Sequence, residues 1–283
     1  MNWPYIREVG FAKFFWRNLK KVFFNRVLGR DCRIRLINGF VMRLPRQNKF
    51  ATEIYITGGN VDWGAEGILR ETIEPGGDFL DVGAHIGYYS ALIHDRCRTV
   101  HAFEPDPRNL ALLASTCLQL GNVKIQPVAV GSSVGKAELV LAQTSAVSYL
   151  AHLDRGKNHG GPLTVVDLTT VDEHCERHNL RVTGIKIDVE GGDFAVLAGA
   201  RQTLERDQPL VLAEIGWSED LQALLAPLHY SVFGSVREKE SRRPSFQEIT
   251  AVPPSNQVTK MLFLVPSRLR PQFVGYGLAD SQK

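Results

Sequence analysis

The chain has 283 residues, of which 44% are hydrophobic and 22% charged, so it is long enough for a sizeable core and is not a wholly disordered protein. No apolar run approaches the roughly 18 residues that a membrane-spanning helix needs. The net charge of +3 hides an uneven distribution, because residues 1–50 carry +10, residues 51–230 carry −11 and residues 231–283 carry +4. The acidic middle of the chain argues against a nucleic-acid partner.

The N-terminal residues 1–65 are expected to form an extension of the main domain. Apolar residues recur at helical spacing over residues 6–28, with basic residues on another face, which predicts a basic amphipathic helix. We expect its apolar stripe to pack on the main domain as a cap, and the alternative is contact with a partner protein or with the inner face of an anionic membrane. Residues 32–44 predict a β-hairpin that turns at Asn38-Gly39.

The residues from 66 to 283 alternate between strand and helix signals, which predicts a mostly parallel sheet with helices on both faces. Strands are expected at Asp78–Val82, Thr99–Phe103, Val123–Val130, Gly184–Val189, Pro209–Ile215, Tyr230–Phe233 and Met261–Val265. Helices are expected at 87–95, between N-cap Asp106 and Gly121, at 192–206 and at 218–226. Two polar or glycine-rich stretches, 142–162 and 235–259, are predicted to be long loops.

Four widely spaced cysteines indicate a reducing compartment. Cys32, Cys97, Cys117 and Cys175 form no Cys-x-x-Cys pair, so neither structural zinc nor a disulfide framework is expected. We expect reduced, mostly buried thiols in a cytoplasmic protein, and the first residues lack the apolar core and cleavage site of a signal peptide.

The strongest local signal is the segment Phe79-Leu-Asp-Val-Gly-Ala-His-Ile-Gly-Tyr88. A hydrophobic strand runs into Asp81, and Gly83 and Gly87 bracket a tight turn where the backbone can come close to a ligand. Glu104 ends the next strand, where a carboxylate can accept both hydroxyls of a ribose. The dinucleotide fingerprint Gly-x-Gly-x-x-Gly is absent, and a carboxylate at this turn favours a cation over a pyrophosphate. The motif therefore favours S-adenosylmethionine over NAD, and the alternative is a turn whose glycines serve packing alone.

The second signal is Ile185-Lys-Ile-Asp-Val-Glu-Gly-Gly192, at the end of a strand that should be central. Lys186, Asp188 and Glu190 alternate, so we expect their side chains to leave the same face of the strand. Charges on a central strand are costly unless they are paired or exposed in a cleft. The spacing leaves both a structural ion pair and a catalytic group open.

Residues 75–265 resemble FkbM-type methyltransferases, because five segments follow the order and spacing of that family: FLDVGAHIGYYS, AFEPDPRNLALL, VAVGSSVGKAEL, IKIDVEGGDFAVLAGA and PLVLAEI. The resemblance implies a Rossmann-like class I methyltransferase fold, an α/β domain with a mostly parallel seven-stranded sheet. It also implies S-adenosylmethionine as the cofactor. His85 departs from the pattern, since the family often has Asn there.

The resemblance further implies roles for individual residues. The cofactor would be bound by Asp81, Gly83, Ala84, His85, Gly87 and Tyr88 near its methionine end, by Glu104 at the ribose, and by Val128 and Ala129 at the adenine. The catalytic candidates that would face the transferring methyl group are Lys186, Asp188 and Glu190. The candidates for contact with the acceptor are Ser145, Ser148 and Glu214, although the two serines fit a solvated loop equally well.

The expected activity is O-methylation, since family members mostly act on hydroxyls of sugars, glycolipids or secondary metabolites. An alcohol needs help with its proton during attack, so we hypothesise that Asp188 or Glu190 is the base and that Lys186 orients it or the substrate. A metal held by the two carboxylates is disfavoured, because the motif has no His or Asn to complete its ligands. The alternatives are an NAD(P)-dependent oxidoreductase or nucleotide-sugar enzyme, and a catalytically silent domain that docks on a membrane or a partner.

Overall fold

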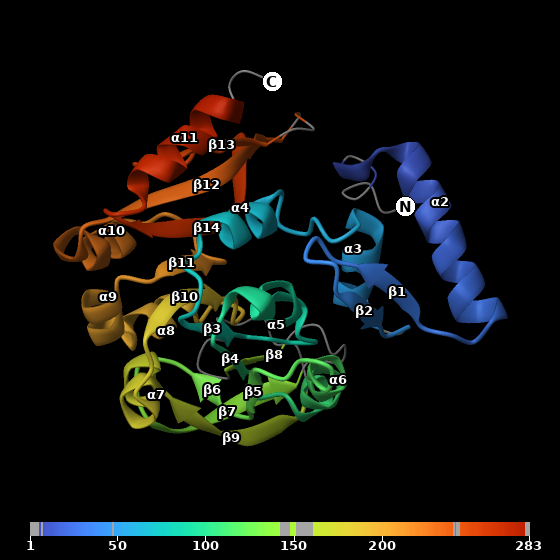
Figure 1. Ribbon diagram of the computed structural model, residues 1–283, viewed down its shortest axis with the longest axis horizontal. Coiled ribbons are helices and arrows are strands. Elements are labelled where there is room, and N and C mark those ends of the chain that lie inside the picture. Colours follow the sequence, from blue (N-terminus) through green and yellow to red (C-terminus); the bar gives the residue numbers. More distant parts are fainter. Residues whose placement is uncertain are drawn as a thin grey trace.

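A computed structural model gives the fold, and it describes residues 6, 8–46, 48–141, 148–150, 161–239, 241 and 244–280. The centre of the described part is an eight-stranded sheet, beside which lie a four-stranded sheet and a hairpin (Figure 1). In sheet order the central strands are β13 (Ser245–Glu248), β12 (Tyr230–Glu238), β14 (Gln257–Pro266), β11 (Leu210–Ala213), β10 (Val182–Ile187), β3 (Asp78–Val82), β4 (Thr99–Phe103) and β5 (Val123–Gln126).

Five neighbouring strands, from β11 to β5, run parallel, while β14 is antiparallel to both of its neighbours. This confirms the predicted α/β class with a doubly wound, mostly parallel sheet. The sheet has eight strands and not the expected seven, because β13 adds an edge strand within the predicted loop 235–259. The chain moves outward in one direction from β3 through β4 to β5 and in the other from β10 to β11, so the order reverses between β3 and β10. Sheets of this kind bind ligands at the carboxyl ends of the strands beside such a reversal.

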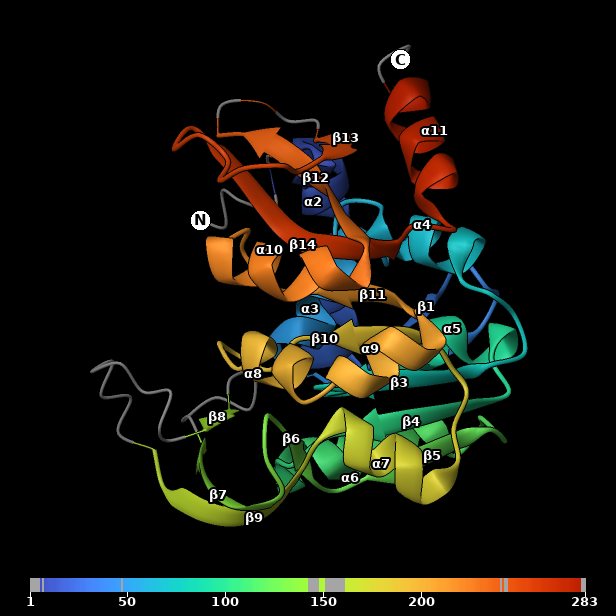
Figure 2. The same ribbon diagram turned by 90° about the vertical axis from the view of Figure 1, so that its left-hand side faces the viewer.

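The helices cover both faces of the sheet, as the alternation of the sequence predicts. On one face lie α4 (Ala65–Thr72), α5 (Tyr88–Ile93) and α11 (Arg270–Asp280). On the other lie α7 (Val171–His178), α8 (Asp193–Ala198), α9 (Arg201–Asp207) and α10 (Glu219–Leu225), to the left of the sheet in Figure 1 and in front of it in Figure 2. Along β3, Phe79 packs on the first face and Leu80 and Val82 on the second, so the strand places apolar side chains on both faces of the sheet.

Three element predictions need correction. The expected strand Val123–Val130 is divided at Pro127 into β5 and β6 (Ala129–Val130), because proline cannot donate to a sheet. The expected helix 192–206 is divided into α8 and α9 near Gly199, whose Cβ would lie 2.2 Å from the carbonyl oxygen of Gly131. The predicted loop 235–259 is not a loop throughout, since it holds the end of β12, all of β13 and the start of β14.

The second sheet is built from strands that flank the predicted loop 142–162 in sequence, and one of its strands falls within that loop. Its strands, in order, are β6, β9 (Leu163–Thr169), β7 (Gly135–Leu141) and β8 (Ser148–Leu150). β8 falls within the predicted loop, and residues 142–147 and 151–160 lie outside the described part of the chain. Helix α6 (Pro107–Cys117) begins after N-cap Asp106, as predicted.

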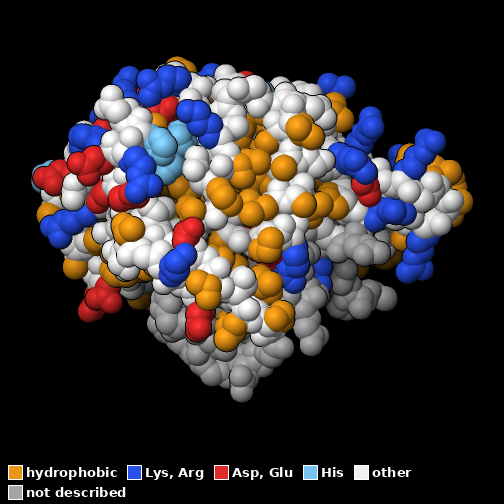
Figure 3. All heavy atoms as spheres, turned by 90° about the horizontal axis from the view of Figure 1, so that it is seen from below, with side chains coloured by type: hydrophobic (Ala, Val, Ile, Leu, Met, Phe, Trp, Pro, Cys, Tyr) orange, Lys and Arg blue, Asp and Glu red, His pale blue; other side chains and the backbone are white. Residues whose placement is uncertain are grey.

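The N-terminal extension contains the predicted helix and hairpin. Helix α2 (Phe11–Val22) continues into a short π-helix, η1 (Phe23–Val27), and the hairpin consists of β1 (Cys32–Arg35) and β2 (Val41–Leu44). An additional helix, α3 (Lys49–Thr57), connects this extension to the main domain. The extension projects at the right-hand edge of Figure 3, where hydrophobic and basic side chains stand together.

The expectation that the apolar stripe of the N-terminal helix packs on the main domain is wrong. No residue of α2 is buried, and the side chains of Phe11, Phe15 and Leu19 are 68%, 52% and 48% exposed. The half-buried side of α2 includes Phe14 and Arg17 instead. All four cysteines are free and buried, as expected. Among the described residues, no helix combines the length and the apolar character needed to cross a bilayer.

Candidate active site

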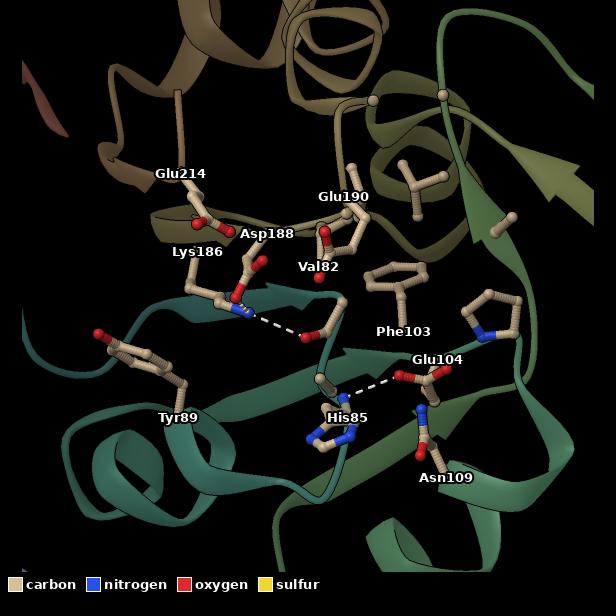
Figure 4. A pocket seen from close by; sticks show the side chains of 18 of the residues that line it. Val82, His85, Tyr89, Phe103, Glu104, Asn109, Lys186, Asp188, Glu190 and Glu214 are labelled. Atoms are coloured by element: carbon tan, nitrogen blue, oxygen red, sulfur yellow. Dashed lines mark hydrogen bonds and ion pairs between the residues drawn. The ribbon is translucent and has the colours of Figure 1, made fainter. Parts of the chain in front are cut away.

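A cavity of about 460 Å³ opens beside the reversal of chain order, at the carboxyl ends of β3, β4, β10 and β11. Its volume lies within the range of small-molecule sites, roughly 300–1,000 Å³. Most of the residues predicted from the sequence line it together: Gly83, Ala84, His85, Tyr88, Glu104, Val128, Ala129, Lys186, Asp188, Glu190 and Glu214. Figure 4 shows Glu104 and His85 toward one end and Lys186, Asp188 and Glu214 toward the other.

The turn after β3 is locked against the turn after β10. Gly83 has φ of 78°, and a Cβ there would lie 1.9 Å from the backbone oxygen of Asp188. The backbone N–H of Asp188 donates to the carbonyl of Val82 at 3.1 Å, and the ammonium of Lys186 donates to the carbonyl of Gly83 at 2.8 Å. The two sequence motifs therefore form one structural unit.

His85 holds the middle of the glycine turn. Its φ is 52°, in the left-handed region, which Asn and His enter more readily than most residues. This explains why His can stand where the resembling family often has Asn. Its backbone N–H donates to Glu104 Oε2 at 2.9 Å, and its ring meets that of Phe50 edge to face with centroids 5.2 Å apart.

Glu104 is buried and faces the cavity beside this turn. One carboxyl oxygen accepts the N–H of His85, and the other accepts the backbone N–H of Asp106 at 2.8 Å. The side chain of Asn109 also hydrogen-bonds this carboxyl group, so about one of its four acceptor sites remains for a hydroxyl donor from a ligand. Burial raises the pKa of Glu104 to about 7, so its charge is sensitive to pH near neutrality.

Asp81 and Gly87 shape the turn and are not among the residues that line the cavity, and their contact with a cofactor stays a prediction. The carboxylate of Asp81 is fully buried, and it accepts hydrogen bonds from the backbone N–H and the hydroxyl of Ser90 at 2.8 and 2.6 Å. Gly87 precedes α5 with φ of 82°, and a Cβ there would lie 2.8 Å from Leu113. Both residues fix α5 relative to the sheet.

Lys186, Asp188 and Glu214 form a cluster of ionisable side chains at the other end of the cavity. The ammonium of Lys186 lies 3.4 Å from Asp188 Oδ2 and 3.9 Å from Asp81 Oδ1. Burial opposes the positive charge, but the two carboxylates outweigh it and raise the pKa of Lys186. The buried lysine is therefore a permanent cation, and the ion pair that the spacing left open is present.

The two carboxyl groups beside this lysine differ in protonation. Burial acts against ionisation of Asp188, but the charge of Lys186 and a hydrogen bond with Glu214 lower its pKa. Partial desolvation, this hydrogen bond and the charge of Asp188 raise the pKa of Glu214 to about 9. At neutral pH Asp188 is thus a carboxylate, and Glu214 is a carboxylic acid whose O–H donates to it.

The alternation predicted for Lys186, Asp188 and Glu190 ends earlier than expected. β10 stops at Ile187, so Asp188 and Glu190 lie in the following turn, and Glu190 has φ of 51°. The left-handed backbone changes the direction of the chain, yet both carboxyl side chains still line the cavity. Of the predicted acceptor residues, Ser145 lies outside the described residues, and Ser148 is described only as backbone in β8.

A second polar group lines the cavity and was missed from the sequence. The ammonium of Lys260, on β14, lies 2.9 Å from Glu53 Oε1 on α3 and 3.5 Å from Asp62 Oδ1. Asp62 also accepts a hydrogen bond from the hydroxyl of Tyr89 at 2.5 Å. No local spacing pairs residues so far apart in the chain, and Lys260 lies just before the predicted strand Met261–Val265, so no pattern in the sequence singled it out.

The family comparison gives one match to this chain. A family model described as "Methyltransferase FkbM domain" matches residues 81–251, which include both motifs of the cavity. No curated protein with a matching sequence was found.

Solved structures with a similar arrangement include several methyltransferases. A methyltransferase FkbM from Methylobacillus flagellatus is 17% identical with a TM-score of 0.43, over 75% of this chain and 52% of its own, so the chain spans about half of that protein. A precorrin-6y C5,15-methyltransferase from Geobacter metallireducens is 11% identical with a TM-score of 0.41, over 75% and 90%. TYW2 of M. jannaschii, solved in complex with AdoMet, is 11% identical with a TM-score of 0.39, over 80% and 81%.

The interlocked turns predict a large difference between two glycine substitutions. Gly191→Ala is expected to cost about 1 kcal/mol for its left-handed backbone alone, since no atom lies within 4 Å of its added Cβ. Gly83→Ala must also displace the carbonyl of Asp188, so it should lower the free energy of unfolding by at least about 2 kcal/mol more. Urea titrations measure both, and equal losses would contradict the interlock.

The protonated Glu214 predicts a pH-dependent gain in stability for Glu214→Gln. Between about pH 4.5 and 9 the folded protein binds a proton on Glu214 that the unfolded chain has released, so the wild type loses stability as the pH rises through this range. Glutamine cannot ionise and still donates to Asp188. The free energy of unfolding of the variant, measured by urea titration at about pH 5, 7 and 9, should therefore rise progressively relative to that of the wild type. Glu205→Gln, on the exposed side of α9, is the control, and parallel curves for Glu214→Gln and wild type would refute the shared proton.

Proposed function

The chain belongs to the FkbM methyltransferase family, and from this premise we propose that it is an S-adenosylmethionine-dependent O-methyltransferase. Its acceptor would be a hydroxyl of a sugar, glycolipid or secondary metabolite. The observation that carries the proposal is a single cavity with the glycine turn and Glu104 at one end and the Lys186–Asp188 pair at the other.

The residues of the cavity fit this cofactor. Glu104 retains acceptor capacity for a hydroxyl of a ribose, and Phe103 and Val128 offer apolar surface to an adenine nearby. Even without the protonated Glu214, acidic side chains outnumber lysines in the wall of the cavity, which favours a ligand with a positive charge. When bound, S-adenosylmethionine supplies an electrophilic methyl group on a sulfonium sulfur.

The charged residues suit proton removal from an alcohol. Lys186 is a buried cation, so it positions Asp188 and the glycine turn and does not act as a base. Asp188 is a weak base, because Lys186 and Glu214 both stabilise its charge. Glu190, exposed toward the cavity from the same turn, is the better candidate. It would accept the hydroxyl proton as the acceptor oxygen bonds to the methyl carbon, whose bond to sulfur breaks.

The polar wall of Glu53, Asp62 and Lys260 supports an acceptor with several hydroxyls. These groups lie within the cavity, and together with Tyr89 they offer both donors and acceptors. A polyhydroxylated ring can form hydrogen bonds with such a set at several points. An apolar acceptor would cover the buried Asp62 and its neighbours without offering them any hydrogen bond. This favours the sugar and glycolipid classes.

Calorimetric titration tests the cofactor. We expect S-adenosylhomocysteine to bind and NAD not to, and we expect Glu104→Gln to weaken binding about tenfold or more. The affinity of the wild type should fall as the pH drops below about 7, because the protonated Glu104 loses its charge, and the variant should show no such fall. Tighter binding of NAD than of S-adenosylhomocysteine would overturn the proposal.

Glu190→Gln tests the base. We expect methyl transfer from labelled S-adenosylmethionine to a panel of sugars, glycolipids and secondary metabolites to fall by about 10²-fold or more, while S-adenosylhomocysteine affinity stays near that of the wild type. Asp188→Asn is the comparison, and it should also lower stability because it leaves the buried Lys186 without its nearest carboxylate. Unchanged turnover in Glu190→Gln would remove it as the base.

A further inference from the structure

The N-terminal helix presents a continuous apolar stripe to the outside of the molecule. We define the outer apolar stripe by six residues of α2 and the start of η1, each at least 42% exposed: Phe11, Phe15, Trp16, Leu19, Val22 and Phe23. Soluble proteins rarely expose so many large apolar side chains together, and such patches mark interaction sites. The stripe therefore needs a partner that the described residues do not provide.

The attachment of α2 to the protein keeps the stripe outward. The guanidinium of Arg17 donates to the carbonyl of Ile56 at the end of α3, at 2.7 Å. Asn25 of η1 accepts a weak hydrogen bond from the thiol of Cys32 on β1. These anchors lie on the half-buried side of the helix, so the helix is held by its polar side and its apolar side is left available.

The surroundings of the stripe are strongly basic. Residues 9–49 contain eleven Lys and Arg but a single acidic residue, Asp31. Asp31 is already paired, with the guanidinium groups of Arg43 at 2.7 Å and Arg46 at 3.5 Å. Lys13 and Lys20 are exposed on α2 next to the apolar side chains. An apolar stripe flanked by cations is complementary to a surface that presents apolar groups and negative charges side by side.

A second cavity, of about 620 Å³, lies beside the end of η1 and is lined by four arginines. Arg30 and Arg33 are exposed there, and Asp31, which pairs with Arg43 and Arg46, also lines the cavity. The rest of the lining is Phe24, Gly29, Cys32 and Tyr55. Guanidinium groups bind phosphate oxygens in pairs of parallel hydrogen bonds. The cavity thus offers a phosphate site directly adjacent to the apolar stripe.

We propose that α2, η1 and the arginine cavity bind the surface of a bilayer that contains anionic phospholipids. The outer apolar stripe lies at the boundary between headgroups and acyl chains, the lysines of α2 face the anionic surface, and the arginine cavity receives a phosphate headgroup. A projecting convex helix suits a planar surface better than the groove that a protein partner would need to supply. This inference is independent of the methyl-transfer chemistry.

Vesicle flotation with the full chain tests the proposal. We expect binding to vesicles of phosphatidylcholine with about 30 mol% phosphatidylglycerol, at least about tenfold weaker binding to phosphatidylcholine alone, and weakening by salt. Phe15→Glu/Leu19→Glu should reduce binding to the anionic vesicles about tenfold or more. Arg30→Glu/Arg33→Glu should reduce it by a similar factor and flatten its salt dependence.

Matched surface substitutions away from this region are the controls. Leu118→Glu replaces an apolar side chain that is 85% exposed after α6, and Arg201→Glu reverses an exposed charge on α9. Both should bind vesicles like the wild type, and circular dichroism should show all variants folded. The proposal is overturned if the wild type does not float, if the controls lose as much as the stripe variants, or if sedimentation velocity shows a dimer that Phe15→Glu/Leu19→Glu dissociates without any vesicle binding.

Discussion

The close packing of two backbone turns is the constraint on which the cavity depends. Gly83 lies so near the carbonyl of Asp188 that no side chain fits between them, and the ammonium of Lys186 bonds the carbonyl of Gly83 while pairing with Asp188. The end of β3 and the end of β10 are thereby fixed relative to each other at the reversal of chain order. Every carboxyl group proposed to act in the cavity is oriented by, or lies adjacent to, this contact.

Three carboxyl groups in the same cavity are given different protonation by their surroundings. Glu104 is buried among backbone donors, Asp188 lies beside a buried ammonium, and Glu214 shares a proton with Asp188. Their pKa values are therefore spread from below the ordinary range for a carboxyl group to about 9. Such separation is what permits one pocket to hold a hydroxyl acceptor, a fixed anion and a neutral hydrogen-bond donor at one pH.

The sequence predicts the central strands well because of where they lie. Asp78–Val82 and Thr99–Phe103 match β3 and β4 residue for residue, since a strand covered on both faces is rich in apolar residues and its ends are marked by turn signals. Asp106 and Pro107 mark the start of α6 by local chemistry alone. The glycine-turn motif and the charged motif are local in the same sense, and most of the residues predicted from them line the same cavity.

Features that depend on distant contacts could not be predicted. Asp62 and Lys260 meet through the folding of the whole sheet, and neither has a local partner that signals the pairing. Gly199 divides a regular helical pattern because another loop's carbonyl approaches it. The amphipathic pattern of α2 predicts that one side of the helix is apolar. It does not predict whether that side faces a core or the outside, because both kinds of helix have the same pattern.

Helix α3 belongs to both of the surfaces discussed, because it anchors Arg17 of α2 and contributes Lys49, Phe50 and Glu53 to the wall of the candidate active site. If the bilayer holds α2, an acceptor dissolved in the same leaflet would reach the cavity by lateral diffusion. Its effective concentration would then be a mole fraction in the membrane, and diluting it with inert lipid would slow the reaction even at constant bulk concentration. Surface-dilution kinetics would be the natural description of such an enzyme.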